Sequence, residues 1–527
     1  MLTTCFISDS SAGRRSRWPF LSGMFGESLL MLSVHLHDSP ARNEPENPFR
    51  RRDTMKRGKY LSTAVLGLGI LLGGNTVQGE TLREAIETMI QTNPEVRSLA
   101  HNRLGRDQEV RQAQADYLPK LDFIAGYGVQ EIQEPEEDSL NPGVYTLSLR
   151  QNVFAGMQTV NEVARQKDRV RSAAYNLQGA SENTALKTAE VYLKVIRSQE
   201  LLALSEENLQ THLRIADQIK MRSESGVASK ADSDQVSGRV ALAQANVIAT
   251  KTNVIDAQTN YQAVVGRMPS DLQPPDSPEG VMPASLEEAE AEAIKGHPTL
   301  KSAGADLDAR NKQHEVAKAP YMPIVDIEVD QHWEDDLDEP GSEEDLIAMV
   351  KLRYNLFHGF RNQARRAETA ELIEEAREIR NNTHRQVVES IRLSWMAYEA
   401  ARERIGYLEE RVTATVDTAR SYTDQFNLGK RTLLDVLDTE AEVIDAKKSL
   451  VEARYDGLLA QYRVLNGLGK LVHSFDLQWP EESIVSEDEQ AEEAKADDKG
   501  QAATIRGTKN ATSRVLVHPI EIGVING

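Results

Sequence analysis

Few side chains of this sequence have the types and spacing of a catalytic or metal-binding centre. Residues 314–318 read His-Glu-Val-Ala-Lys, which begins like the zinc motif His-Glu-x-x-His but has Lys318 where the second histidine belongs. The one cysteine, Cys5, excludes a disulfide framework and a cysteine-ligated metal. The 11 histidines are scattered, and no glycine-rich phosphate loop follows an expected strand. We therefore expect neither an enzyme nor a cofactor or metal site.

The composition favours long helices over catalytic domains. Aromatic residues make up 5% of the 527 residues and charged residues 27%, with many Ala, Glu, Gln, Arg and Leu residues, as in amphipathic helices. The 61 basic and 82 acidic residues give a formal net charge of −21. Because phosphates need neutralisation by Lys and Arg, we expect no nucleic-acid partner.

The first 79 residues have the pattern of a leader. From Met55 a basic stretch precedes an apolar run over residues 61–72, and small residues lie before Glu80. The run is shorter than the roughly 20 residues of a membrane-spanning helix. We expect residues 55–79 to be a secretory signal peptide and residues 1–54 an over-extended N-terminus; an N-terminal membrane anchor is the alternative.

The rest of the sequence contains one pattern twice. Residues 117–122 (YLPKLD) correspond to residues 321–326 (YMPIVD), and the stretch from Gly226 to Asp232 corresponds to that from Gly429 to Asp435. We expect a first structural repeat over residues 80–272, a Pro-rich linker over 273–284 and a second repeat over 285–470.

Each repeat is expected to contain a helix, two strands and a long helical hairpin. Alternation of apolar and polar residues indicates the strands, which cover residues 121–130, 144–152, 324–333 and 345–355. A soluble sheet with one wet face would alternate in the same way. Three features favour membrane strands instead: a length of about ten residues, charges of both signs on the polar side, and a leader for export.

Four strands cannot close a barrel, and open sheet edges are not tolerated in lipid, so other copies of the chain must complete the wall. The charged residues expected to line the lumen are Arg150, Asp326, Glu328, Asp330, Lys351 and Arg353. These charges either set an ion preference or pair with one another across the strands.

Two long helical segments follow the strand pairs, over about residues 157–224 and 360–426. At roughly 1.5 Å per residue, each would form a rod of roughly 100 Å. Turns are expected near Gly226 and Gly429, and heptad rows in the return helices predict coiled-coil packing. Residues 481–527 are expected to form an acidic disordered tail.

Residues 428–438 (LGKRTLLDVLD) are similar to the second periplasmic hairpin turn of the TolC-like outer-membrane efflux proteins of Gram-negative bacteria. The likeness covers about residues 81–471, and the opening residues 81–85 (TLREA) and 117–128 resemble the type I secretion branch. The resemblance implies a mostly α fold with a membrane β part. Three chains, each giving four strands, would share a twelve-stranded β-barrel, continuous with a long α-helical coiled-coil barrel.

The resemblance also implies a location and partners. The homotrimer would lie in the outer membrane of a Gram-negative bacterium, among outer-membrane lipid, with an extension into the periplasm. Its partners would be a periplasmic adaptor (membrane fusion protein) and an inner-membrane ABC transporter.

In that family, acidic residues beside the second turn close the periplasmic entrance as rings about the three-fold axis. The matching positions are Asp435 and Asp438, while Arg431 matches a basic residue that holds the closed tip and Asp232 matches an acid of the first hairpin. Converging carboxylates repel one another and attract cations. For Asp232 and Asp435, a capping box that starts the return helix is the alternative. Asp438 lies a turn further on, where capping does not explain it.

Three functions stay open. The first is the exit duct of a type I secretion system, which exports a polypeptide. The second is the outer-membrane factor of a multidrug or metal efflux pump, which the absence of a lipidation cysteine after the leader disfavours. The third is a coiled-coil scaffold that is no channel.

Overall fold

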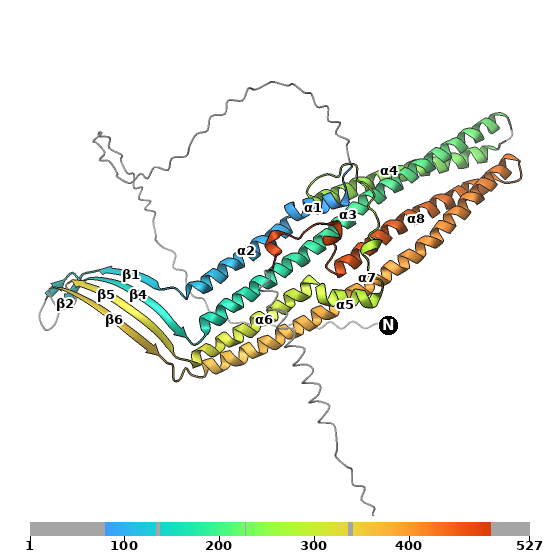
Figure 1. Cartoon of the computed structure of the whole chain (residues 1–527). Helices are drawn as coiled ribbons and strands as arrows, with labels where there is room; N and C mark the ends of the chain where they lie inside the picture. Colours follow the sequence, from blue (N-terminus) through green and yellow to red (C-terminus); the bar gives the residue numbers. More distant parts are fainter. Residues whose placement is uncertain (1–78, 133–137, 227, 336–340, 486–527) are drawn as a thin grey trace, which may run out of the picture. The chain divides into compact units, whose positions relative to one another are not determined.

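The computed structural model describes residues 79–132, 138–226, 228–335 and 341–485, and within these ranges the chain runs twice through one order of elements (Figure 1). The first half contains α1 (Leu82–Thr92), α2 (Pro94–Ala115), β1 (Lys120–Tyr127), β4 (Gly143–Ala155), α3 (Gln158–Glu224) and α4 (Lys230–Val265). The second half contains α5 (Leu286–Gly296), α6 (Pro298–Lys318), β5 (Ile324–Asp335), β6 (Ser342–Arg353), α7 (Arg361–Asn427) and α8 (Leu433–Gly467). Equivalent helices have nearly equal lengths: α1 and α5 have 11 residues each, and α3 and α7 have 67 each.

The starts of the helices follow from local sequence. Thr81 and Glu84 form a capping box, in which the Thr81 backbone N–H donates to Glu84 Oε2 at 3.1 Å and the Glu84 backbone N–H donates to Thr81 Oγ1 at 3.3 Å. Pro94 separates α1 from α2, because proline lacks the N–H of a helix interior but suits a first helical position.

The strands β1, β4, β5 and β6 form one antiparallel sheet in the order β1-β4-β5-β6. Hairpins join β1 to β4 and β5 to β6, and the pairing of β4 with β5 joins the two repeats. The first strand ends at Tyr127, earlier than residue 130. The Gly128 N–H still donates to Pro142 O at 2.9 Å in the same register, but Pro142 has no N–H for the return bond of the ladder. The short strands β2 (Gln130–Ile132) and β3 (Asp138–Leu140) pair beyond it.

The sheet and the hairpin turns lie at opposite ends of the long helices (Figure 1). Both α3 and α7 begin a few residues after a strand and end 67 residues later at a turn. At about 1.5 Å per residue, roughly 100 Å separates the two ends. No helix in the described ranges is long and apolar enough to cross a membrane.

The largest apolar core lies in the middle of the helices, where α1 and α5 and the segment after α8 pack against them. Among its fully buried side chains are Tyr192, Tyr261, Ile391 and Leu465. A second, smaller core lies near the turns and consists of Ile219, Val236, Leu433 and Leu437.

The segment after α8 corrects the expected start of the tail. Residues 481–485 fall within the expected disordered tail, yet Ser483 is 1% exposed and its carbonyl accepts a hydrogen bond from Gln178 Nε2 at 2.8 Å. Val485 packs beside Ala174 and Tyr175 on α3. The packed chain therefore continues to Val485; the rest of the expected tail, and the expected leader up to residue 78, lie outside the described residues.

Candidate functional site

One face of the sheet carries charges that pair across the strands. Glu328 on β5 lies opposite Arg150 on β4, and Arg150 Nε is 2.9 Å from Glu328 Oε1. Lys351 on β6 donates to the other oxygen of the same carboxylate. The Glu328 carboxylate, only 4% exposed, therefore has a cation on each side.

The next row toward the helices repeats this arrangement. Asn152 Nδ2 donates to Asp326 Oδ1 at 2.7 Å, and Arg353 donates to the second oxygen. Asp330 lies on the same face, one row from Glu328 toward the loops and opposite Ser148, and has no ion pair with any described residue. The structure thus brings five of the six expected lumen charges into contact, and cross-strand pairing accounts for those five.

The other face of the sheet is apolar and open. The exposed fractions are 64% for Leu121 and Phe123, 70% for Val350 and 66% for Leu352. Such a continuous apolar surface marks contact with a membrane or another protein. Within the described chain, β1 and β6 each pair on one side only, so both edges of the sheet have free backbone groups.

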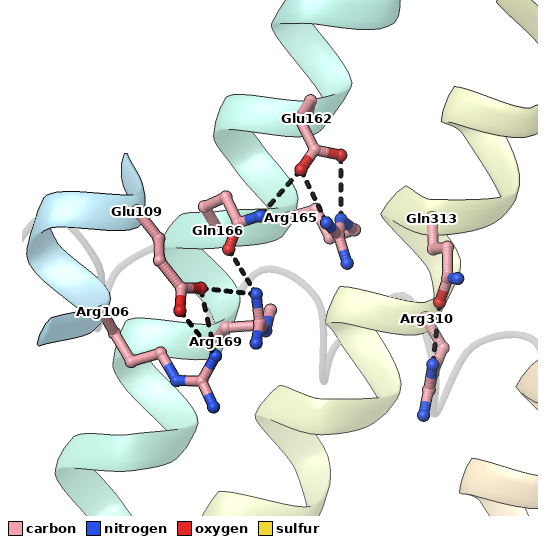
Figure 2. A network of polar contacts seen from close by, with 8 residues as sticks. All are labelled: Arg106, Glu109, Glu162, Arg165, Gln166, Arg169, Arg310 and Gln313. Atoms are coloured by element: carbon pink, nitrogen blue, oxygen red, sulfur yellow. Dashed lines mark hydrogen bonds and ion pairs between the residues drawn. The ribbon is translucent and has the colours of Figure 1, made fainter. Parts of the chain in front are cut away.

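A polar network next to the sheet fixes α2 against α3 (Figure 2). Glu109 on α2 accepts from Arg106 on its own helix at 2.9 Å and from Arg169 on α3 at 2.6 Å. Arg169 also donates to Gln166 at 2.7 Å, which in turn donates to Glu162 at 2.7 Å. These bonds join the first turns of α3, just after β4, to the helix that leads into β1.

The hairpin turns are helix ends closed by glycine. Gly226 and Gly429 have φ values of 74° and 73°, the left-handed conformation that glycine adopts without strain. After α7, the Lys430 N–H donates to Gln425 O at 2.8 Å and the Gly429 N–H donates to Phe426 O at 3.0 Å. This Schellman pattern explains why the chain reverses at these residues.

Two of the four expected gate residues act as helix caps. Ser229 Oγ and Thr432 Oγ1 accept from the backbone N–H groups of Asp232 and Asp435 at 3.2 and 3.3 Å, and each carboxylate accepts the backbone N–H of the capping residue in return. The hydrogen bond from the Thr432 side chain is the main cause that lowers the pKa of Asp435, against weak desolvation. Within one chain, these two carboxylates therefore start α4 and α8.

The other two expected gate residues make different contacts. Asp438 on α8 accepts from Arg239 Nη2 on α4 at 2.8 Å, which connects the two hairpins. Arg431 stays within its own hairpin: its guanidinium lies 4.0 Å from the centre of the Tyr422 ring, Nε donates to Gln425 at 3.1 Å, and Asp435 is 3.9 Å away. Asp438 is thus the one of the four whose bond holds the two hairpins together.

The sheet, the long helices and the hairpin turns match a known protein family. The family model described as "Outer membrane efflux protein" matches residues 85–267 and 291–470, which together include both repeats. The chain belongs to this family. An outer membrane efflux protein accounts for the exposed apolar face of the sheet, and it places this protein in the outer membrane.

Relatives and solved structures agree with that assignment. The chain is 24% identical over 415 residues to the outer membrane efflux protein BepC of Brucella suis, covering 78% of this chain and 90% of BepC. It is 23% identical over 434 residues to the outer membrane protein TolC of Escherichia coli, covering 78% and 87%. The structure of CusC has a TM-score of 0.67 at 13% identity, covering 73% of this chain and 91% of CusC. VceC of Vibrio cholerae has a TM-score of 0.63 at 18% identity, covering 74% and 96%. The fold is therefore that of a TolC-like efflux protein.

Two polar residues of this efflux protein are buried although no pattern in the sequence predicts their burial. Glu182 on α3 is 2% exposed and accepts hydrogen bonds from the Leu471 N–H at 2.8 Å and the Val472 N–H at 3.2 Å, and from Trp479 Nε1 at 2.8 Å. His212, also on α3, is 4% exposed near the turns, and burial together with the nearby Arg239 lowers its pKa. Nothing in the sequence separates these two side chains from the exposed ones of the same helix.

The zinc-like motif has a packing role in the structure. His314 Nδ1 lies 2.8 Å from Thr369 Oγ1, so the side chain joins α6 to α7. Among the described residues, no group of three or more His, Cys, Asp or Glu side chains is placed to hold a metal ion.

Proposed function

We propose that this protein is the outer-membrane exit duct of a type I secretion system and passes a polypeptide out of the cell. The observation that carries the channel part is the sheet: one face is apolar and exposed, the other bears charges, and both edges are unpaired in the described chain. Three such sheets joined edge to edge form a twelve-stranded barrel, with lipid outside and water inside.

Two relatives support the secretion branch. The chain is 25% identical over 300 residues to the protein CyaE of Bordetella pertussis and 20% identical over 426 residues to the proteases secretion protein PrtF of Dickeya chrysanthemi. A duct of this kind works with a periplasmic adaptor and an inner-membrane ABC transporter. A drug or metal efflux duct is the second candidate, because BepC is named as an efflux protein and matches over more of this chain than CyaE does.

At the periplasmic end, we assign the gate to the hairpin tips. Asp438 supports this because its ion pair with Arg239 joins the two hairpins, and opening a tube of paired hairpins requires them to separate. Asp232 and Asp435 keep their caps in either state, and their charges still lie at the tip. Arg431, stacked on Tyr422, keeps the second turn rigid.

Two experiments test the proposal. Purified protein in planar bilayers is expected to give step-like currents; no current under any condition would favour a scaffold over a channel. Deletion of the gene is expected to stop secretion of the substrate of an ABC exporter encoded beside it and to leave drug susceptibility unchanged. Normal secretion with increased drug susceptibility would assign the duct to an efflux pump instead.

A further inference from the structure

The polar face of the sheet is divided along the strands. The half next to the helices carries Arg150, Lys351 and Arg353, and its carboxylates, Asp326 and Glu328, are bonded to these cations. Lys120 at the start of β1 is paired with Asp116, 3.1 Å away. This half therefore has slightly more positive than negative charge, and its carboxylates are neutralised.

The half toward the loops contains carboxylates and no cationic Lys or Arg in the described strands. The strand register places on this face the residues Asp122, Asp330, Glu334, Glu343 and Asp345. Not one of the five has an ion pair with a described residue. Glu334 and Glu343 lie directly opposite each other on β5 and β6, a like-charge pair that costs stability.

We propose that the lumen of the assembled channel is electrostatically divided along its length, and that these five carboxylates make its loop end cation-selective. The inference rests on the proposed function, because it requires the polar face to line a lumen. With three copies of each carboxylate around the axis, the field at the loop end concentrates cations and excludes anions. The paired charges near the helices contribute little, since each carboxylate there has a cation at contact distance.

The dependence of ion selectivity on salt concentration provides a test of the inference. The Debye length is about 10 Å at 0.1 M salt and about 3 Å at 1 M, so the carboxylates act across the lumen only in dilute salt. Reversal potentials are therefore measured with 0.1 M KCl at the loop end and 1 M KCl at the tip end, and again with the two solutions exchanged. In the first arrangement the loop-end carboxylates are expected to contribute to the preference for K⁺ over Cl⁻. In the second arrangement the carboxylates at the hairpin tips act instead, so the loop-end contribution is read from variants that change the loop end alone.

The chain offers a matched pair of double variants. Glu334→Gln with Glu343→Gln removes two charges from the polar face, whereas Asp335→Asn with Glu344→Gln removes two from the apolar face at neighbouring positions of the same strands. The first variant is expected to lower the K⁺/Cl⁻ permeability ratio by about twofold or more with dilute salt at the loop end. The second is expected to leave the ratio at the wild-type value, and trimer formation on gels checks that both assemble.

Two results overturn the inference while leaving the channel intact: equal permeability ratios for the two double variants, or an effect of the first variant that is the same in both salt arrangements. Wild-type protein that forms no step-like current overturns the inference together with the proposed function.

Discussion

Glu182 shows how one buried carboxylate holds the segment after α8 on α3. Burial raises the pKa of Glu182 to about 7, against the lowering effect of the hydrogen bonds from Trp479, Val472 and Leu471. The folded chain thus binds this proton more tightly than the unfolded chain, whose glutamate has the ordinary pKa of 4.5. The contribution of Glu182 to the free energy of unfolding is therefore largest below pH about 4.5 and falls as the pH rises to about 7, by about 3 kcal/mol.

Glu182→Gln is expected to remove this pH dependence, because the amide does not ionise. It also places an NH2 group against N–H donors, which costs about 1–3 kcal/mol at acidic pH. Hydrogen exchange of the Leu471 and Val472 amides, corrected for the intrinsic effect of pH, measures both. Amide protection in the wild type that does not fall between pH 5 and pH 7.5 would contradict the assignment.

The two acids near the second turn are expected to respond differently to substitution. Asp438→Asn weakens the bond to Arg239, so we expect a higher single-channel conductance. We expect little loss of stability, because a half-exposed ion pair contributes only about 0.2–1 kcal/mol. Asp435→Ala removes the carboxylate of the capping box at the start of α8, while the Thr432 cap remains, and is expected to cost about 0.3–1 kcal/mol. A double variant, Asp435→Ala with Asp438→Ala, should also show weaker block by cations.

Asp445→Asn is the control for Asp438→Asn. Asp445 lies one heptad further along α8 and pairs with Arg411 of the same hairpin at 2.8 Å, so its loss separates no hairpins. Conductance that rises equally in both variants would show that loss of any ion pair loosens the helices, and would remove the gate assignment from Asp438.

At the scale of elements, what could be predicted from the sequence is what short stretches determine. Thr81 and Pro94 start α1 and α2 through their immediate neighbours, and the turns expected near Gly226 and Gly429 are present. The alternation of Val325, Asp326 and Ile327 likewise predicts faces without any knowledge of the partner strand. The resemblance to the efflux family likewise depends on short stretches, residues 81–85, 117–128 and 428–438.

Contacts between distant residues could not be predicted in this way. The bond between Arg239 and Asp438 spans 199 positions, and that between Leu471 and Glu182 spans 289. The pairing of β4 with β5 depends on how the two repeats meet, which no local pattern contains. Among the expected lumen charges, only Asp330 has no ion pair with a residue that the structure describes. Local patterns do not indicate this, because pairing depends on which residues lie opposite in the register.

The two faces of β6 provide a test of the sheet as an element. Val350 lies on the apolar face and Met349 on the polar face. A lysine facing lipid near the middle of a bilayer costs about 2–4 kcal/mol, whereas one in a water-filled lumen costs little. Val350→Lys is therefore expected to abolish assembly, and Met349→Lys to permit it, as measured by heat-modifiable trimers on gels. Equal tolerance of both substitutions would mean that neither face contacts lipid.

At the scale of the whole molecule, exposed apolar rows on the helices indicate that a single chain leaves surfaces for another chain to cover. On α4, Ile248 and Ile255 are seven residues apart and 68% and 61% exposed. On α7, Leu393 and Tyr407 are 14 residues apart and 65% and 66% exposed. Rows at heptad spacing are what a coiled coil buries, and each apolar side chain removed from water contributes about 1.5–3 kcal/mol. A neighbouring copy of the chain is the surface that our proposed trimer supplies.

Ile248→Glu with Ile255→Glu is therefore expected to break the trimer, because each of three interfaces would bury two unpaired charges in place of apolar contacts. The molar mass in detergent, by light scattering, should fall from that of a trimer to that of a monomer. Asn253→Glu with Asn260→Glu should keep the trimer, because these two exposed positions also lie seven residues apart but each is turned by about 140° around the helix from the isoleucine row. The sheet leads to a second expectation. In the described chain β1 and β6 each pair on one side only, so a separated chain has two open edges and an exposed apolar face, and it should aggregate once detergent is removed. A wild-type chain that stays monomeric and dispersed in water would contradict both arguments at once.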